Sequence, residues 1–121
     1  MRLLIVDDSS LIRNRIARAM THPALQSITI IGMAKNGKEA LNIFSQTQPD
    51  IVTMDLTMPE MDGVKCTESM TQINPDVSIL VISAVSDKKT AIMALKKGAK
   101  GFLYKPFTDK QLIDAFEEMM N

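Results

Sequence analysis

The chain has 121 residues, no tryptophan and one cysteine, and its fourteen basic and fourteen acidic side chains leave no formal net charge. This length suits one domain, expected over residues 1–121, with a core that needs no disulfide or structural metal. Zero net charge gives no overall attraction for nucleic acid, although a local patch would remain open to it. The lone Cys66 excludes an internal disulfide and a Cys/His zinc site, which fits a reducing cytoplasm. The apolar run after Met1 is too short for a signal peptide or a membrane span.

Short apolar runs recur along the chain and have the composition of buried β-strands. A run without polar alternation is typical of a strand that is buried on both faces of a parallel sheet. The expected strands are Arg2–Val6, Ile28–Met33, Ile51–Asp55, Val77–Ile82 and Phe102–Tyr104.

Helical spacing of apolar residues separates these runs and predicts five helices. Their starts are expected near Ser9, the Ala34–Gly37 turn, Asp62, Ser86 or Asp87, and Thr108 or Asp109. The first helix should end at His22-Pro23, and Met58-Pro59 should begin a loop. The residues expected to face the core are Ile12, Ile16, Ala19, Met20, Ala40, Leu41, Phe44, Val64, Thr67, Met70, Ala91, Ile92, Leu95, Leu112, Phe116 and Met119.

Alternating strands and helices predict an α/β fold, a doubly wound five-stranded parallel sheet with helices on both faces. Among the common orders, the flavodoxin-like order 2-1-3-4-5 suits five strands and places the first and third strand ends side by side. The crevice beyond the carboxyl ends of such strands is where ligands bind.

Polar residues converge on that edge: Asp7 and Asp8 after the first strand, Asp55 at the third, Ser83 after the fourth and Lys105 after the fifth. Three crowded carboxylates are a natural site for Mg²⁺, and a lysine and a serine opposite them would bind phosphoryl oxygens. Asp55 would then be the nucleophile. A simpler interpretation makes Asp55 a turn cap and Lys105 a solvated lysine.

The segments VDDS, MDLTMPEMDG, ISA and YKPF, in this order, resemble the receiver domains of two-component response regulators, and most of all the stand-alone receivers of the CheY type. The resemblance covers the whole chain, and part of the expected strand order comes from it. It implies that Asp55 accepts a phosphoryl group from a histidine kinase or a histidine phosphotransfer protein. It also implies Mg²⁺ bound by Asp8, Asp55 and the backbone carbonyl of Thr57, with Asp7 acting through water.

The same resemblance implies that Ser83 is the switch hydroxyl and that Lys105 contacts the phosphoryl group, with a cis bond between Lys105 and Pro106. Phe102 corresponds to the aromatic residue that turns inward on activation, and without a hydroxyl it should favour the buried position more than a tyrosine would. Tyr104 is expected on the other side of the strand from that position.

Downstream proteins are expected on the fourth helix, fifth strand and fifth helix. The lysines of this region would form a partner site or an ordinary solvated face; they are Lys88, Lys89, Lys96, Lys97, Lys100 and Lys110. The arginines of the first helix, Arg13, Arg15 and Arg18, would be a solvated face or meet an acidic kinase.

Departures from the family pattern set further expectations. Thr57 and Val85 occupy variable positions that influence how fast water removes the phosphate. Val85 and Ala91 replace more polar or bulkier residues on the surface that the motor-binding chemotaxis protein uses, so a flagellar target is not assumed.

Three alternatives remain. A Mg²⁺-dependent phosphohydrolase would share the aspartyl-phosphate step, but Thr57 stands where such enzymes usually carry a second aspartate. A flavin binder would need a Ser/Thr/Gly loop where Asp7 and Asp8 stand. The chain would also suit a receiver cut from a longer DNA-binding regulator, although its end soon after the fifth helix modestly favours a stand-alone protein. A receiver is not an enzyme beyond its own phosphorylation and slow dephosphorylation.

Overall fold

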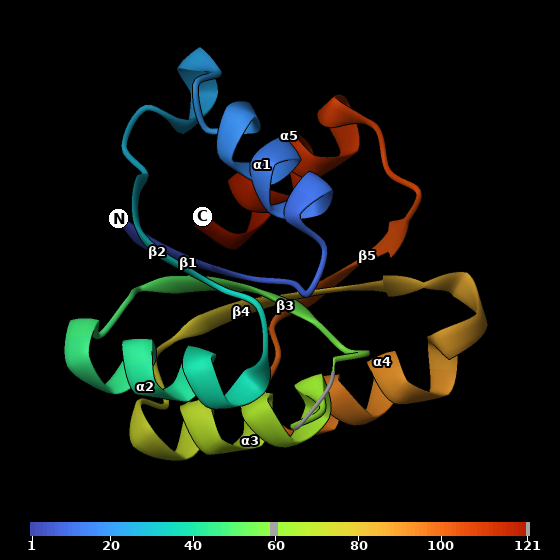
Figure 1. Ribbon diagram of the computed structural model, residues 1–121. Coiled ribbons are helices and arrows are strands. Elements are labelled where there is room, and N and C mark those ends of the chain that lie inside the picture. Colours follow the sequence, from blue (N-terminus) through green and yellow to red (C-terminus); the bar gives the residue numbers. More distant parts are fainter. Residues whose placement is uncertain (59–60, 121) are drawn as a thin grey trace.

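A computed structural model describes residues 1–58 and 61–120, and its centre is one parallel sheet. The strand order is β2-β1-β3-β4-β5, which confirms the predicted doubly wound fold (Figure 1). The strands are β1 (Arg2–Val6), β2 (Thr29–Ala34), β3 (Ile51–Asp55), β4 (Ser78–Ala84) and β5 (Gly101–Lys105).

Helices cover both faces of the sheet. Helices α1 and α5 lie on one face, and α2, α3 and α4 lie on the other (Figure 1). Their bounds are α1 (Ser10–Ala19), α2 (Gly37–Thr47), α3 (Gly63–Ile73), α4 (Lys88–Lys96) and α5 (Asp109–Met120), with short 3₁₀ turns at Pro23–Leu25 and Val85–Asp87. The first helix thus ends at Ala19, before the predicted stop, because the chain then makes tighter turns. Of the predicted loop start at Met58-Pro59, the proline lies outside the described residues.

Short polar side chains begin most of the helices. Ser9 accepts a hydrogen bond from the amide of Ile12, and Asp62 accepts one from the amide of Lys65. Such caps satisfy amides that lack a partner within the helix. Asn36 and Thr108 cap α2 and α5 in the same way. Asp87 stands before α4 but makes no side-chain capping bond.

A core fills each face of the sheet, and the alternation of side chains along a strand decides which of the two cores each residue enters. Leu3 and Ile5 pack toward α1 and α5, whereas Leu4 and Val6 pack toward the other helices. The predicted core positions fully buried in the structure are Ile16, Met20, Ala40, Phe44, Thr67, Met70, Ala91, Leu112 and Phe116. Ile12, Ala19, Leu41, Val64, Leu95 and Met119 are partly buried.

The expectation for Ile92 is wrong, because its side chain is 43% exposed. Its neighbour Ala91 is buried, so Ala91 is also not part of the surface to which it was assigned. Helix α4 therefore packs against the core along a narrower apolar stripe than its composition suggests.

Cys66 is buried in α3 near the carbonyl of Gly37, and burial raises the pKa of its thiol to about 12. Cys66 therefore packs in the core as a small apolar group.

Gly63 fixes how closely α3 approaches the end of β3. A Cβ atom at this position would lie 2.3 Å from the carbonyl oxygen of Asp55 and 2.6 Å from the Cα of Leu56. Only glycine allows this approach, because both neighbours are backbone atoms. The start of α3 therefore packs directly against the backbone of Asp55 and Leu56.

Across the helices of residues 1–58 and 61–120, none combines the length and apolar character needed to cross a membrane.

Candidate functional site

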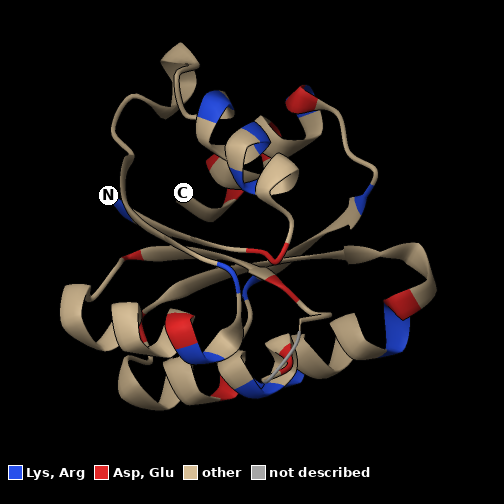
Figure 2. Ribbon diagram, viewed as in Figure 1, with Lys and Arg blue, Asp and Glu red and all other residues tan. Residues whose placement is uncertain are grey.

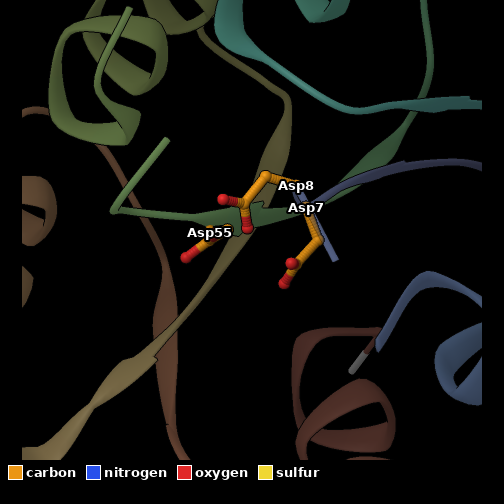
Figure 3. Close-up of side chains that lie close together, drawn as sticks. All are labelled: Asp7, Asp8 and Asp55. Carbon is orange, nitrogen blue, oxygen red and sulfur yellow. The ribbon is translucent and has the colours of Figure 1, made fainter. Parts of the chain in front are cut away.

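Three carboxylates meet at the carboxyl ends of β1 and β3. Each of Asp7, Asp8 and Asp55 offers an oxygen, and these oxygens lie within 4.8 Å of one another (Figure 3). The two strands are neighbours in the sheet, so their ends bring the acids together as predicted. Asp7 and Asp55 are buried, whereas Asp8 is exposed at the mouth of the cluster.

Lys105 reaches this cluster from the end of β5. Its Nζ lies 3.2 Å from Oδ2 of Asp7 and 3.5 Å from Oδ1 of Asp55. The peptide bond between Lys105 and Pro106 is cis, as expected from the family resemblance. The lysine is thus an ion-pair partner of two acids, and the interpretation as a free solvated lysine is wrong.

Backbone amides hold the two buried acids in place. The amide of Ser9 donates to Oδ1 of Asp7 at 2.9 Å, and the amide of Thr57 donates to Oδ1 of Asp55 at 3.3 Å. Each bond spans two residues and forms the turn that follows a strand end. The carboxylates are therefore fixed by the loops that follow their own strands.

Burial and, to a lesser degree, the charge of Asp7 together raise the pKa of Asp55 to about 6, and Lys105 opposes this rise. For Lys105, burial acts to lower the pKa, but the carboxylates of Asp55 and Asp7 outweigh it and the pKa is raised. One ammonium thus does not balance the crowded negative charge. Hard carboxylate oxygens with uncompensated charge are the donor set that Mg²⁺ prefers, so the residues present fit this ion.

Ser83 lies at the end of β4, on the strand between Asp55 and Lys105. It is buried, and its hydroxyl has no hydrogen-bond partner among the residues that the structure describes. A buried hydroxyl without a partner is costly, so this group is available to a ligand that arrives beside it. Thr57 and Val85 are exposed on the loops around the site.

Phe102 and Tyr104 lie on the same side of β5, and the sequence expectation for Tyr104 is wrong. Residues two apart on a strand share a face. The two ring centroids are 5.1 Å apart, and Phe102 is 44% exposed. Whether Phe102 is buried in a phosphorylated form stays a prediction.

Two arginines of α1 were not expected to contact the site. Arg13 donates to the carbonyl of Asp7 at 2.6 Å. Arg15 lies 4.5 Å from the ring centroid of Phe107, donates to its carbonyl and lies 3.5 Å from Asp109. Both anchor the loops that hold Asp7 and Lys105, so they are more than a solvated face. The helical spacing of these arginines, on the polar side of α1, does not predict these contacts.

A further contact joins the loops after β3 and β4. The hydroxyl of Thr57 donates to Oδ2 of Asp87 at 3.5 Å, so Asp87 contacts the loop after β3 instead of capping α4. The sequence offered Asp87 only as a helix cap.

Comparisons with known proteins agree with this geometry. Residues 3–117 match the model of the response regulator receiver domain. The chain is 37% identical to the chemotaxis protein CheY of Thermotoga maritima over 98% of this chain and 96% of that protein. It is 34% identical to CheY of Bacillus subtilis over 99% of this chain and 98% of that protein.

Solved structures share the same fold. A complex of CheX, CheY, BeF₃ and Mg²⁺ from Borrelia burgdorferi contains a chain with a TM-score of 0.90 and 29% identity, and the match covers 100% of this chain and 90% of that one. The receiver domain of NarL from Mycobacterium tuberculosis has a TM-score of 0.86 and 30% identity, with 97% and 93% covered. The chain belongs to the response regulator receiver family of two-component signalling and is of the CheY-like type.

Proposed function

We propose that the protein is a phosphorylation-activated switch in which Asp55 accepts a phosphoryl group from the phosphohistidine of a kinase or phosphotransfer protein. The observation that supports this proposal most strongly is the arrangement of Lys105, Asp7 and Asp8 around Asp55. A carboxylate oxygen of Asp55 attacks phosphorus, the bond from phosphorus to the imidazole nitrogen breaks, and the imidazole leaves. The product is an acyl phosphate on Asp55.

The acidic cluster is proposed to hold Mg²⁺ through Asp8, Asp55 and the carbonyl of Thr57, with Asp7 acting through water. When bound, the ion would neutralise the charge of the transferring phosphoryl group. Lys105 already lies beside Asp55, where its ammonium would bind a phosphoryl oxygen. The likeness to the Borrelia chain from a complex with BeF₃ and Mg²⁺ supports this assignment.

The buried, unpaired hydroxyl of Ser83 is proposed to move toward the phosphoryl group, and Phe102 then turns inward. Phosphorylation shifts the balance between two arrangements of these residues. Water then slowly hydrolyses the acyl phosphate on Asp55. The protein is proposed to catalyse only its own phosphorylation and this dephosphorylation. Residues 1–121 are proposed to act as one receiver domain in the cytoplasm.

A downstream protein is proposed to bind the surface formed by α4, β5 and α5. Ile92, Met93 and Phe102 are exposed there, with fractions of 43%, 53% and 44%. Exposed lysines lie on α4 and α5, although Lys97 pairs with Glu68 and Lys110 pairs with Asp114. Figure 2 shows charges of both signs spread over the helices, which supports a protein partner over nucleic acid.

The test is incubation with Mg²⁺ and acetyl phosphate, followed by detection of an acid-stable, base-labile adduct. We expect one adduct per chain in the wild type and none with Asp55→Asn or after chelation of Mg²⁺. An adduct that survives Asp55→Asn would contradict the proposal. Rapid repeated hydrolysis of a phosphoester would instead favour the phosphohydrolase.

A further inference from the structure

We propose that Tyr104 is a second ring of the switch, a positioning residue that holds Phe102 in its outward place until Asp55 is phosphorylated. This inference rests on the function proposed above and extends the switch from Phe102 and Ser83 to a third side chain.

The contact between the two rings is the first observation. Their centroids are 5.1 Å apart and their planes are inclined by 58°, a geometry in which aromatic rings attract each other. Phe102 lies on the edge strand of the sheet and is 44% exposed. Its outward place therefore leaves much of the ring in water, and Tyr104 supplies an aromatic contact there. If Phe102 turns inward, this contact has to be remade or lost.

The strand register is the second observation. Tyr104 is the β5 partner of Ser83 on β4, whereas Phe102 is the partner of Val81. Partners on neighbouring strands point to the same face, and Val81 belongs to the core cluster on the α4 side. Ser83, Phe102 and Tyr104 therefore share this face. Tyr104 is beside Ser83 in the sheet, and Phe102 is diagonal to it.

The unpaired hydroxyl of Ser83 connects the phosphorylation site to the two aromatic rings. It is buried and free of partners within the described part of the chain, so a phosphoryl group on Asp55 would draw it away from its present position. The residue paired with Ser83 on β5 is Tyr104. Movement of Ser83 changes the surroundings of Tyr104, and the ring contact passes the change to Phe102.

The chain supplies its own probe, because Tyr104 is the only tyrosine and there is no tryptophan. Tyrosine emission of the full chain therefore reports on this residue alone. The experiment adds Mg²⁺ and beryllofluoride, which mimics the phosphoryl group, and follows emission and its quenching by acrylamide. Fluorine NMR checks separately that the adduct forms. We expect quenching to increase on activation, because Phe102 no longer covers one side of the Tyr104 ring.

Variants separate the ring contact from simple structural support. Tyr104→Leu removes the ring, and we expect faster phosphorylation by acetyl phosphate, roughly 2- to 10-fold, because the outward place of Phe102 loses its partner. Tyr104→Phe keeps the ring, so this variant should be phosphorylated by acetyl phosphate at the wild-type rate. Phe102→Leu should leave only the small response of Tyr104 emission that movement of Ser83 causes, while the adduct still forms.

Three results would overturn the inference without touching the proposed function: an adduct with no change in Tyr104 emission or quenching, a wild-type rate in Tyr104→Leu, or an unchanged response in Phe102→Leu. If Tyr104→Leu does not fold, the wild-type quenching experiment and Phe102→Leu still decide. Absence of any adduct in the wild type would instead contradict the proposed function itself.

Discussion

Lys105 Nζ lies 3.5 Å from Oδ1 of Asp55, although the two residues end strands that are separated by β4. The same ammonium is 3.2 Å from Asp7. The lysine thus crosses the edge of the sheet to the acids, and its ammonium compensates part of their negative charge.

Replacing Lys105 by methionine removes this compensation while it keeps the length of the side chain. We expect the pKa of Asp55 to rise above about 6, because burial and Asp7 then act without opposition. Phosphorylation by acetyl phosphate should slow by roughly 100-fold, the typical effect of losing one charge-stabilising donor. Carbon NMR of the carboxyl group and the adduct time course measure the two effects.

Lys100→Met is the matched control, because Lys100 precedes β5 at the other end of the strand and donates to the carbonyl of Asp76. It should leave both the pKa and the rate unchanged. Equal rates in the two variants would show that Lys105 has no part in the transfer.

The charge of Asp55 makes stability depend on pH. Its folded pKa of about 6 lies above the ordinary 3.8, so the folded chain binds the proton more tightly than the unfolded one. Stability therefore falls as pH rises from about 4 to about 6, and stays lower above that range. Asp55→Asn should raise the free energy of unfolding by about 2 to 3 kcal/mol at pH 7 and have little effect at pH 4.

Urea denaturation at the two pH values measures this difference. Asp76→Asn serves as the control, because Asp76 is an exposed acid beyond the opposite end of β4. A difference between wild type and Asp55→Asn that does not change with pH would rule out ionisation of Asp55 as its cause.

Mg²⁺ should stabilise the folded protein by binding the acidic cluster. At a concentration one hundred times its dissociation constant, a ligand of the folded state adds about 2.7 kcal/mol to the free energy of unfolding. We expect a rise in melting temperature with Mg²⁺ for the wild type and a much smaller one for Asp8→Ala, with Asp76→Asn behaving as wild type. Equal shifts in all three proteins would place the ion elsewhere.

Gly63 allows α3 to start against the backbone of Asp55. Gly63→Ala places a Cβ atom 2.3 Å from a carbonyl oxygen, so either α3 or the end of β3 has to move. We expect a loss of about 3 kcal/mol of stability, at the upper end of the range for overpacking. In Gly101→Ala the nearest side-chain atom would be 3.5 Å away, so this variant should change stability by no more than about 0.5 kcal/mol. Denaturant curves of the two variants test the contrast.

The strands and the acidic site could be predicted because both follow from simple rules. Continuous apolar runs identify buried strands, and the carboxyl ends of parallel strands share one edge, so Asp7, Asp8 and Asp55 had to lie near one another. The side of β5 that carries Tyr104 was also open to prediction, since alternation fixes it, and the expectation misapplied that rule.

Other features depend on packing that a single sequence does not reveal. Ile92 has helical spacing with buried neighbours, yet α4 lies so that this side chain meets solvent. Arg13 and Arg15 have the composition of a solvated face, and only the fold brings their guanidinium groups to the carbonyls of Asp7 and Phe107. Likewise, the contact of Asp87 with Thr57 requires that two loops that are distant in sequence lie side by side.

The central claim is that Asp55 itself carries the phosphoryl group, and chemical mapping tests it most directly. Borohydride reduces an acyl phosphate of aspartate to homoserine, and peptide sequencing by mass spectrometry then locates the modified residue. After reaction with Mg²⁺ and acetyl phosphate, we expect homoserine at position 55 and at no other aspartate. Homoserine at position 7 or 8, or a phosphate retained on a serine or threonine, would contradict the account.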